Sequence, residues 1–217
     1  SFCYNTSVKI EHKIIADKIH LLTFENQIDL TSTFLRFQEH YESPKFSGII
    51  FSLDEYKEWY INNSQNGIKT GDFTYYTDWG GFNIPSTILT PFYGGKFDPL
   101  SESEKVFLDL FKDEKELFYI IGVHKEAKNI EKILDHEIAH GLFFINPEYK
   151  KNVLSILSNY NTDEIRKELL LSGGYNEKVL DDEVHAYSIS GSASMKSSIP
   201  ENLKKELLEL FEESIVK

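Results

Sequence analysis

Hydrophobic and polar positions follow different patterns in the two parts of this chain. Before about residue 125, short apolar runs are interspersed with segments of helical spacing, and turn-forming residues separate them. The apolar runs predict strands over residues 8–24, 48–51, 73–76, 82–92 and 117–123. Helical spacing and capping signals predict helices from Thr31 to about Tyr41, from Ser52 to about Asn63 and over 101–112, with a turn at 63–67.

After about residue 125 the apolar positions recur at helical spacing almost without interruption. The clearest stripe, from about Lys128 to Ile145, consists of Ile130, Ile133, Leu134, Ile138, Leu142 and Ile145. Asn146-Pro147 ends this helix, because the residue before a proline disfavours the α conformation. Further helices are predicted over 147–160, 162–171, 176–187 (with Asn176 as its N-cap) and 200–216. Strands with helices, followed by helices alone, indicate an α+β fold.

Length, composition and charge restrict the classes of protein that fit. The 217 residues are 41% hydrophobic and 27% charged, which is typical of a single globular domain. We expect an α/β subdomain over about 1–125 and a helical subdomain over 126–217. A net charge of −12 without a basic cluster argues against nucleic-acid binding. No apolar run reaches the roughly 18 residues that span a membrane.

The sequence leaves the location and the oligomeric state open. The single cysteine excludes an intrachain disulfide but neither requires nor excludes an oxidising compartment. No signal peptide is visible, yet the chain begins with Ser1 instead of Met, which is compatible with the removal of a preceding segment. A soluble protein in the cytoplasm and a secreted one both fit these observations.

The run His136-Glu137-Ile138-Ala139-His140 lies within the predicted helix over 128–145. It fits His-Glu-x-x-His, a signature of zinc hydrolases. Residues four apart share a helix face, so both imidazoles can bind one metal ion, and Glu137 can reach a water held by that ion. The alternative is a solvated, charged helix face. The apolar flanks favour a buried helix, in which these polar side chains need a partner, and one zinc ion per chain supplies it.

A catalytic zinc ion normally has three protein ligands. The metzincin pattern requires Gly and His where this chain has Phe143 and Asn146, and the only cysteine, Cys3, lies in the N-terminal segment, which disfavours the cysteine ligand of peptide deformylases. An acidic run in a later predicted helix remains. Glu183 is the preferred third ligand and Asp182 the alternative; without a metal, this run is a solvated acidic face.

The motif followed by a later helix containing Glu-x-x-Ala resembles the gluzincin branch of the zincin metallopeptidases. The matching positions in the later helix are Glu183 and Ala186. The resemblance implies that Glu183 is the third zinc ligand and that a small residue lets the two helices pack closely. It also implies a zincin-like fold, with a metal cleft between a sheet subdomain and a helical subdomain. In the thermolysin-like pattern, an Asp four residues after the ligand Glu supports a zinc histidine. This chain has Tyr187 at that position and so departs from the pattern.

The mechanism that follows from the motif is hydrolysis of a peptide or protein substrate. Zinc held by His136, His140 and Glu183 is expected to lower the pKa of a bound water towards about 7. Glu137 is expected to accept the proton of that water and to pass it to the leaving amine.

A second group usually stabilises the oxyanion in such reactions. Tyr187, His185 and Tyr175 are candidates because they lie in or just before the later helix. The alternatives are that Tyr187 packs in the core and that His185 is a surface histidine. The stretch 79–90, with its proline, is a candidate edge strand for pairing with substrate; the alternative is a surface hairpin in which Trp79 fills the core.

Three functions therefore remain under consideration. A zinc-dependent metallopeptidase with Glu137 as general base is the preferred one. The alternatives are a catalytically inactive zincin-fold protein that binds or regulates a partner, and a zinc amidohydrolase that acts on an amide other than a peptide bond. The intact Glu137 favours an enzyme, because a protein that only binds has no need of a base beside the metal.

Overall fold

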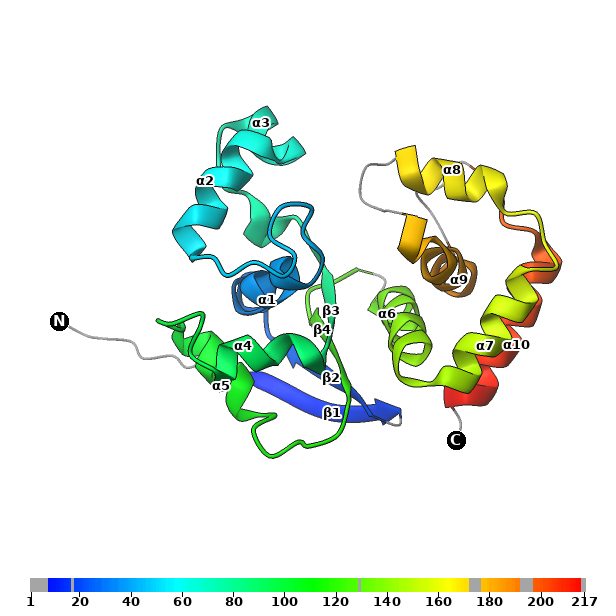
Figure 1. The fold of residues 1–217 in the computed structure, drawn as a ribbon, viewed down its shortest axis with the longest axis horizontal. Coiled ribbons are helices and arrows are strands. Elements are labelled where there is room, and N and C mark those ends of the chain that lie inside the picture. The colour runs from blue at the N-terminus through cyan, green and yellow to red at the C-terminus, as the bar shows by residue number, and fades with distance from the viewer. Residues whose placement is uncertain (1–7, 17, 129, 172–176, 192–196, 216–217) are drawn as a thin grey trace. The chain divides into compact units, whose positions relative to one another are not determined.

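The structure, a computed structural model, is that of a mixed α/β protein (Figure 1). It describes residues 8–16, 18–128, 130–171, 177–191 and 197–215. The backbone divides into two compact units. The sheet unit consists of the described residues up to 13 and within 21–128, and the helical unit of those within 14–20 and 129–217. This division falls close to the change in hydrophobic pattern near residue 125.

A four-stranded sheet forms the centre of the first part of the chain. Its strands are β1 (Ile10–Ala16), β2 (Ile19–Phe24), β3 (Gly81–Pro85) and β4 (Tyr119–His124), in the order β1-β2-β4-β3. All six residues of β4 are buried, as expected for a central strand whose sequence is a continuous apolar run. β3 pairs with it antiparallel, with Asn83 opposite Ile121, and forms an edge of the sheet. Within the predicted stretch 79–90, residues Gly81–Pro85 therefore form an edge strand that includes Pro85. Trp79 is 53% exposed, so the alternative in which it fills the core is wrong.

Helix α1 (Gln27–Glu42) packs against β3 and β4. Its Phe34 is fully buried and stacks on Phe82 of β3, with the ring centroids 5.3 Å apart. This close packing requires a glycine in the facing strand. A Cβ atom on Gly122 of β4 would lie 2.4 Å from Cε2 of Phe34 and 2.9 Å from Cδ1 of Leu30. The one glycine within the apolar run of β4 therefore has a packing role.

Short helices complete the sheet unit. They are α2 (Leu53–Asn63), α3 (Gln65–Thr70), η1 (Tyr75–Thr77), η2 (Ser86–Leu89), α4 (Thr90–Tyr93) and α5 (Glu102–Asp109). The predicted capping boxes at Ser52 and Ser101 are both present. In α5 the capping glutamate, Glu104, also receives bonds of 2.7 and 2.5 Å from Nε and Nη2 of Arg36 in α1. Both side chains are under a tenth exposed, so this paired charge fixes α5 against α1.

Three strand predictions for the sheet unit fail in part or entirely. Residues 48–51 form no strand: Gly48, at a φ of 72°, ends a turn, residues 49–51 are irregular, and only Phe51 is buried. Residues 73–76 lead into η1, because Tyr75 packs edge-on against Tyr56 and Tyr60 of α2 instead of pairing in the sheet. The predicted strand over 82–92 ends at Pro85, and the chain continues into η2 and α4.

Two helix boundaries in the sheet unit also differ from the prediction. Helix α1 begins at Gln27, because the side chain of Asn26 accepts a bond from the backbone N–H of Asp29; Thr31 lies inside the helix. The predicted turn over 63–67 instead starts helix α3, which Ser64 caps through the N–H of Gly67. Both helices use a capping side chain that the apolar pattern does not reveal.

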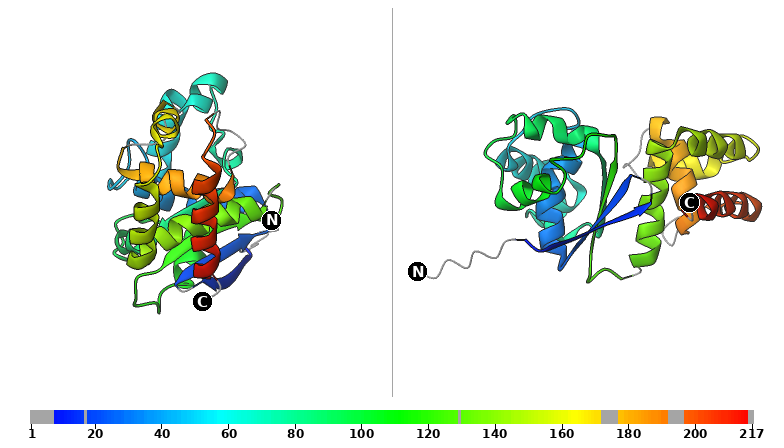
Figure 2. Two further views of the ribbon diagram at one scale, coloured as in Figure 1. Left: turned by 90° about the vertical axis from the view of Figure 1, so that its right-hand side faces the viewer. Right: turned by 90° about the horizontal axis from the view of Figure 1, so that it is seen from below.

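The helical unit contains the predicted helices. They are α6 (Ile130–Ile145), α7 (Pro147–Leu157), α8 (Asp163–Leu171), η3 (Glu177–Val179), α9 (Leu180–Ser190) and α10 (Glu201–Ile215). Asn146 caps α7 through the N–H of Tyr149, which separates α7 from α6 at the predicted Asn-Pro step. Helix α9 packs against α6, α7 and α10, and α6 and α9 lie side by side (Figures 1 and 2). The predicted cap Asn176 lies outside the described residues.

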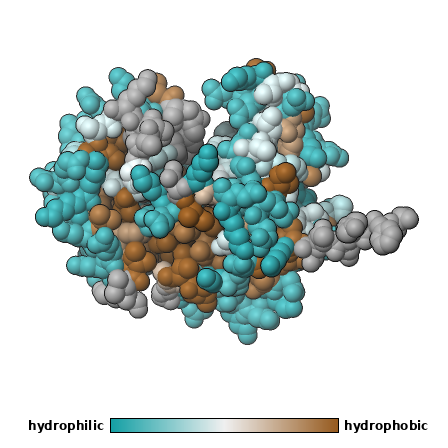
Figure 3. All heavy atoms as spheres, turned by 180° about the vertical axis from the view of Figure 1, so that it is seen from behind, coloured by the Kyte–Doolittle hydropathy of each residue, from teal (hydrophilic) through white to brown (hydrophobic). Residues whose placement is uncertain are grey.

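The surface is mixed in polarity. Figure 3 shows one face, on which apolar residues reach the surface among charged and polar ones. The most exposed large apolar side chains include Leu171 at 76%, Ile68 at 66% and Ile14 at 65%. Among the described residues, none of the helices combines the length and the apolar character that crossing a membrane requires.

Candidate metal centre

The two histidines of the motif lie one turn apart on α6 and point in the same direction. The motif overlaps the apolar stripe of this helix, and two residues of that stripe, Ile138 and Leu142, are buried. The Nε2 atoms of His136 and His140 face each other at 3.1 Å. The helix thus presents two imidazole nitrogens at one place, as the spacing of the motif predicts.

Helix α9 brings the carboxylate of Glu183 to these nitrogens. One of its oxygens lies 3.8 Å from Nε2 of His140 and the other 4.0 Å from Nε2 of His136. Tetrahedral zinc with bonds of about 2.0–2.2 Å separates its ligand atoms by roughly 3.3 Å, so the three groups have suitable spacing. Ala186, one turn after Glu183, is fully buried, as expected where helices pack closely.

The outer nitrogen of each imidazole donates a proton. Oγ of Ser190 gives its own proton to the carbonyl of Ala186 at 3.1 Å, so it accepts from Nδ1 of His136 at 3.2 Å. Nδ1 of His140 lies 2.9 Å from Oδ2 of Asp182, which accepts when ionised. Both Nε2 atoms therefore face each other and the carboxylate of Glu183. These nitrogen and oxygen donors are of the types that zinc binds.

The pKa values of the two histidines are shifted in opposite directions. Burial lowers the pKa of His136, and the neighbouring His140 lowers it further, to about 3. Burial also lowers the pKa of His140, but the carboxylates of Asp182, Glu183 and Glu137 outweigh this effect and raise it to about 10. One imidazole of the pair thus favours its protonated form and the other its neutral form, and a bound metal ion would take the place of that proton.

Asp182, the alternative third ligand, does not lie where a third ligand would. Its Oδ2 atom lies at Nδ1 of His140, the nitrogen that faces away from the proposed metal position. Burial raises the pKa of Asp182, but the charge and the hydrogen bond of His140 lower it to about 2, so it is ionised. Of the two acidic residues considered, Glu183 is the one with its carboxylate at the Nε2 side of both histidines.

Glu137 and Tyr187 both lie beside the three ligands. The charge of Glu137 contributes to raising the pKa of His140, and its side chain is only partly buried. The ring centroid of Tyr187, one turn after Glu183 on α9, lies 4.7 Å from that of His136. Tyr187 is also partly exposed, unlike a residue that only fills the core. Glu137 therefore lies close enough to His140 to act on its charge, and the ring of Tyr187 lies against that of His136.

One further predicted site residue, His185, is not brought to this position. His185 is fully buried: its Nε2 atom bonds to the hydroxyl of Tyr149 at 2.7 Å, and its ring stacks on Phe143. The surface-histidine interpretation is therefore wrong, and we no longer assign His185 to contact with substrate. Tyr175 lies outside the described residues.

The sequence did not predict that Asp182 and Ser190 contact the Nδ1 atoms of His140 and His136. A family pattern places the supporting acid four residues after the third ligand, where this chain has Tyr187. The structure shows the acid directly before Glu183 instead. No local pattern in the sequence indicates this contact, because it depends on how α9 packs against α6.

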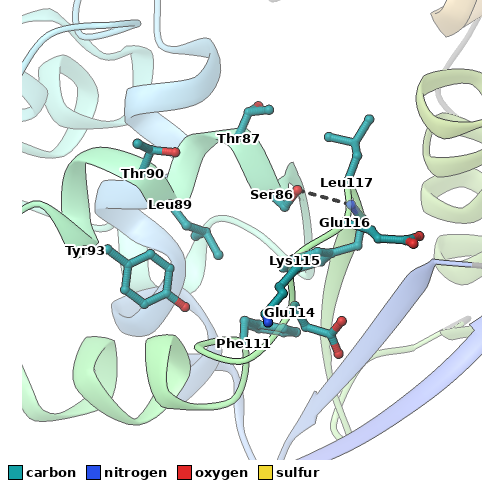
Figure 4. Close-up of a pocket in the computed structure, with 11 residues that line it drawn as sticks. Ser86, Thr87, Leu89, Thr90, Tyr93, Phe111, Glu114, Lys115, Glu116 and Leu117 are labelled. Atoms are coloured by element: carbon teal, nitrogen blue, oxygen red, sulfur yellow. Dashed lines mark hydrogen bonds between the residues drawn. The ribbon is translucent and has the colours of Figure 1, made fainter.

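A pocket in the sheet unit is lined by residues other than those of this cluster. It has a volume of about 340 Å³ and is lined by Ser86, Thr87, Leu89, Thr90, Tyr93, Phe111 and residues 114–118 (Figure 4). Oγ of Ser86 accepts a bond of 3.1 Å from the N–H of Phe118 at its edge. None of the predicted site residues lines this pocket, so it does not enter the assignment of the metal centre.

Comparison of the chain with protein-family models, with curated proteins and with solved structures finds no match in any of the three. The interpretation of the cluster therefore rests on its geometry and chemistry.

Proposed function

We propose that this protein is a zinc-dependent metallopeptidase. The observation that carries the proposal is the convergence of three donors, Nε2 of His136, Nε2 of His140 and the carboxylate of Glu183, within 4.8 Å of one another. The side chains are 18%, 8% and 12% exposed, so the cluster is largely sheltered from solvent. Three protein ligands are the number typical of catalytic zinc, whereas structural zinc normally has four.

Each side chain around the cluster has a separate role in the proposed hydrolysis. Zinc bound there would supply a Lewis acid that polarises a carbonyl group and acidifies water. Glu137, next to His136 on α6, accepts a proton from the attacking water and returns it to the leaving amine. The hydroxyl of Tyr187 donates to the oxyanion that forms at the substrate carbonyl. Asp182 and Ser190 hold the two imidazoles with Nε2 available.

We also propose a zincin-like fold of the gluzincin type. A sheet with an antiparallel edge strand precedes, along the chain, a set of helices that carries the motif and Glu183. Buried Ala186 follows Glu183 by three residues, in agreement with the Glu-x-x-Ala pattern. Peptides and proteins are therefore the proposed substrates.

The test is hydrolysis of peptide libraries and unfolded proteins, alongside small amides, before and after removal of zinc. We expect cleavage of peptides that is lost with a strong chelator and restored by about one equivalent of Zn²⁺ per chain. Cleavage of small amides alone would instead identify a non-peptidase amidohydrolase. Bound zinc without turnover on any substrate would favour a binding or regulatory protein.

Replacement of Tyr187 by Phe tests its assignment to the oxyanion. Loss of a single oxyanion donor reduces kcat by about 10²–10³-fold. We expect a decrease of this order, with KM and zinc content close to those of the wild type, because the phenyl ring preserves the packing on His136. Steady-state kinetics on a cleaved peptide measure it. An unchanged kcat would remove Tyr187 from the reaction.

A further inference from the structure

A chain of polar contacts leads from His140 into the interior of the helical unit. Asp182 uses both carboxylate oxygens: Oδ2 lies 2.9 Å from Nδ1 of His140, and Oδ1 lies 3.6 Å from Nδ1 of His185. Nε2 of His185 lies 2.7 Å from the hydroxyl of Tyr149. His185 is fully buried and Tyr149 is 2% exposed. The contacts join three helices, α6, α9 and α7.

The hydrogen-bonding groups along these contacts can be assigned consistently as donors and acceptors. The hydroxyl of Tyr149 donates to Nε2 of His185, which leaves Nδ1 of His185 as an N–H directed at Asp182. Oδ2 of Asp182 accepts from His140, whereas Oδ1 lies 3.6 Å from Nδ1 of His185, a charge contact longer than a hydrogen bond. Nε2 of His140 faces Glu183 and is the atom that would bind the metal. A buried imidazole that interacted with a carboxylate at one nitrogen and with nothing at the other would be costly, and Tyr149 removes that cost.

Two consecutive acidic residues thus hold one imidazole from opposite sides. Asp182 contacts His140 at Nδ1, and Glu183 approaches the same ring at Nε2. Phe143, on the same helix as His140, stacks on the ring of His185, with the centroids 5.7 Å apart. The carboxylate of Asp182 is therefore held in place by groups on both sides of it.

We propose that Asp182, His185 and Tyr149 act together as a positioning chain that fixes the tautomer and the orientation of His140 as a metal ligand. The inference rests on the proposed metal site and concerns its affinity and geometry. Groups that accept from the outer nitrogen of a metal-bound histidine orient the ring and raise its basicity. Neither His185 nor Tyr149 contacts the metal or the substrate.

The experiment measures metal binding without any substrate. Zinc affinity is determined by competition with a chromophoric chelator, and the visible absorption spectrum of the Co²⁺-loaded protein reports the ligand geometry. We expect Asp182→Asn to weaken zinc binding by about 10–100-fold, the usual effect of losing such a partner. Tyr149→Phe, one contact further away, should weaken it by about two- to tenfold. Both variants should also alter the Co²⁺ spectrum.

A matched control and a double variant separate positioning from general stability. Asp181→Asn changes the neighbouring acid, which pairs with Arg166 instead, and should leave zinc affinity and the Co²⁺ spectrum unchanged. If the three residues act as one chain, Tyr149→Phe adds little to the effect of Asp182→Asn, since the contact it supports is already lost. Circular dichroism confirms that each variant is folded.

The outcomes distinguish this inference from the proposed function. Equal zinc affinity and equal Co²⁺ spectra in wild type, Asp182→Asn and Tyr149→Phe would overturn the positioning chain and leave the peptidase proposal intact. Wild-type protein that binds zinc and responds to these variants, but cleaves no peptide, would overturn the peptidase proposal and support the chain. A wild-type protein that binds no zinc would overturn both.

Discussion

Glu137→Gln is expected to keep about one zinc per chain and to lose most of the hydrolytic activity. Gln has nearly the shape of Glu but cannot accept a proton from water, so the change removes the base and leaves the metal ligands in place. General acid–base catalysis by a positioned side chain contributes about 10²–10⁴-fold to the rate, and we expect kcat to decrease by that factor. Elemental mass spectrometry and kinetics on the same sample measure both quantities.

Glu131→Gln provides the control for this experiment. Glu131 lies in the first turn of the same helix and is exposed, so the substitution makes the same chemical change away from the cluster. It should alter neither zinc content nor kcat. A Glu137→Gln protein that holds zinc and turns over at the wild-type rate would exclude Glu137 as the base. A variant that loses its zinc would show that Glu137 helps to hold the metal.

The part of the site that lies within α6 could be predicted from the sequence because it is local. Four-residue spacing on a helix places His136 and His140 together whatever the rest of the fold does. The capping boxes at Ser52 and Ser101 could be predicted for the same reason, since each is complete within four residues. In contrast, the third ligand depends on how α9 packs against α6, and the sequence offered both Glu183 and Asp182 for that position.

The partners of the histidines could not be predicted, because they depend on packing between helices. Asp182 and His185 stand within one turn of Glu183, yet their side chains serve different neighbours on α6 and α7. The failed strand at 73–76 has a similar cause. Its aromatic residues fit a strand by composition, but Tyr75 is held by the rings of Tyr56 and Tyr60, which come from a helix earlier in the chain.

Glu183→Ala is expected to have the largest effect on the metal itself. The change removes one of three donors and leaves two imidazoles and open space, which do not make a zinc site of the usual kind. We expect the zinc affinity to fall by more than about 100-fold, beyond the range for a partner that touches only a ligand. Chelator competition and zinc content of the dialysed protein measure the loss, and circular dichroism shows whether the helices remain.

The comparison of neighbouring acids on one helix makes this result decisive. Asp181→Ala should keep zinc, because its carboxylate pairs with Arg166; Asp182→Asn should weaken zinc binding moderately; Glu183→Ala should nearly abolish it. The expected order of zinc affinities follows from the atoms that each carboxylate contacts. It does not follow from a difference in net charge, because each substitution removes one negative charge. Zinc binding that is unaffected in Glu183→Ala but lost in Asp182→Asn would reverse the two roles and make Asp182 the third ligand.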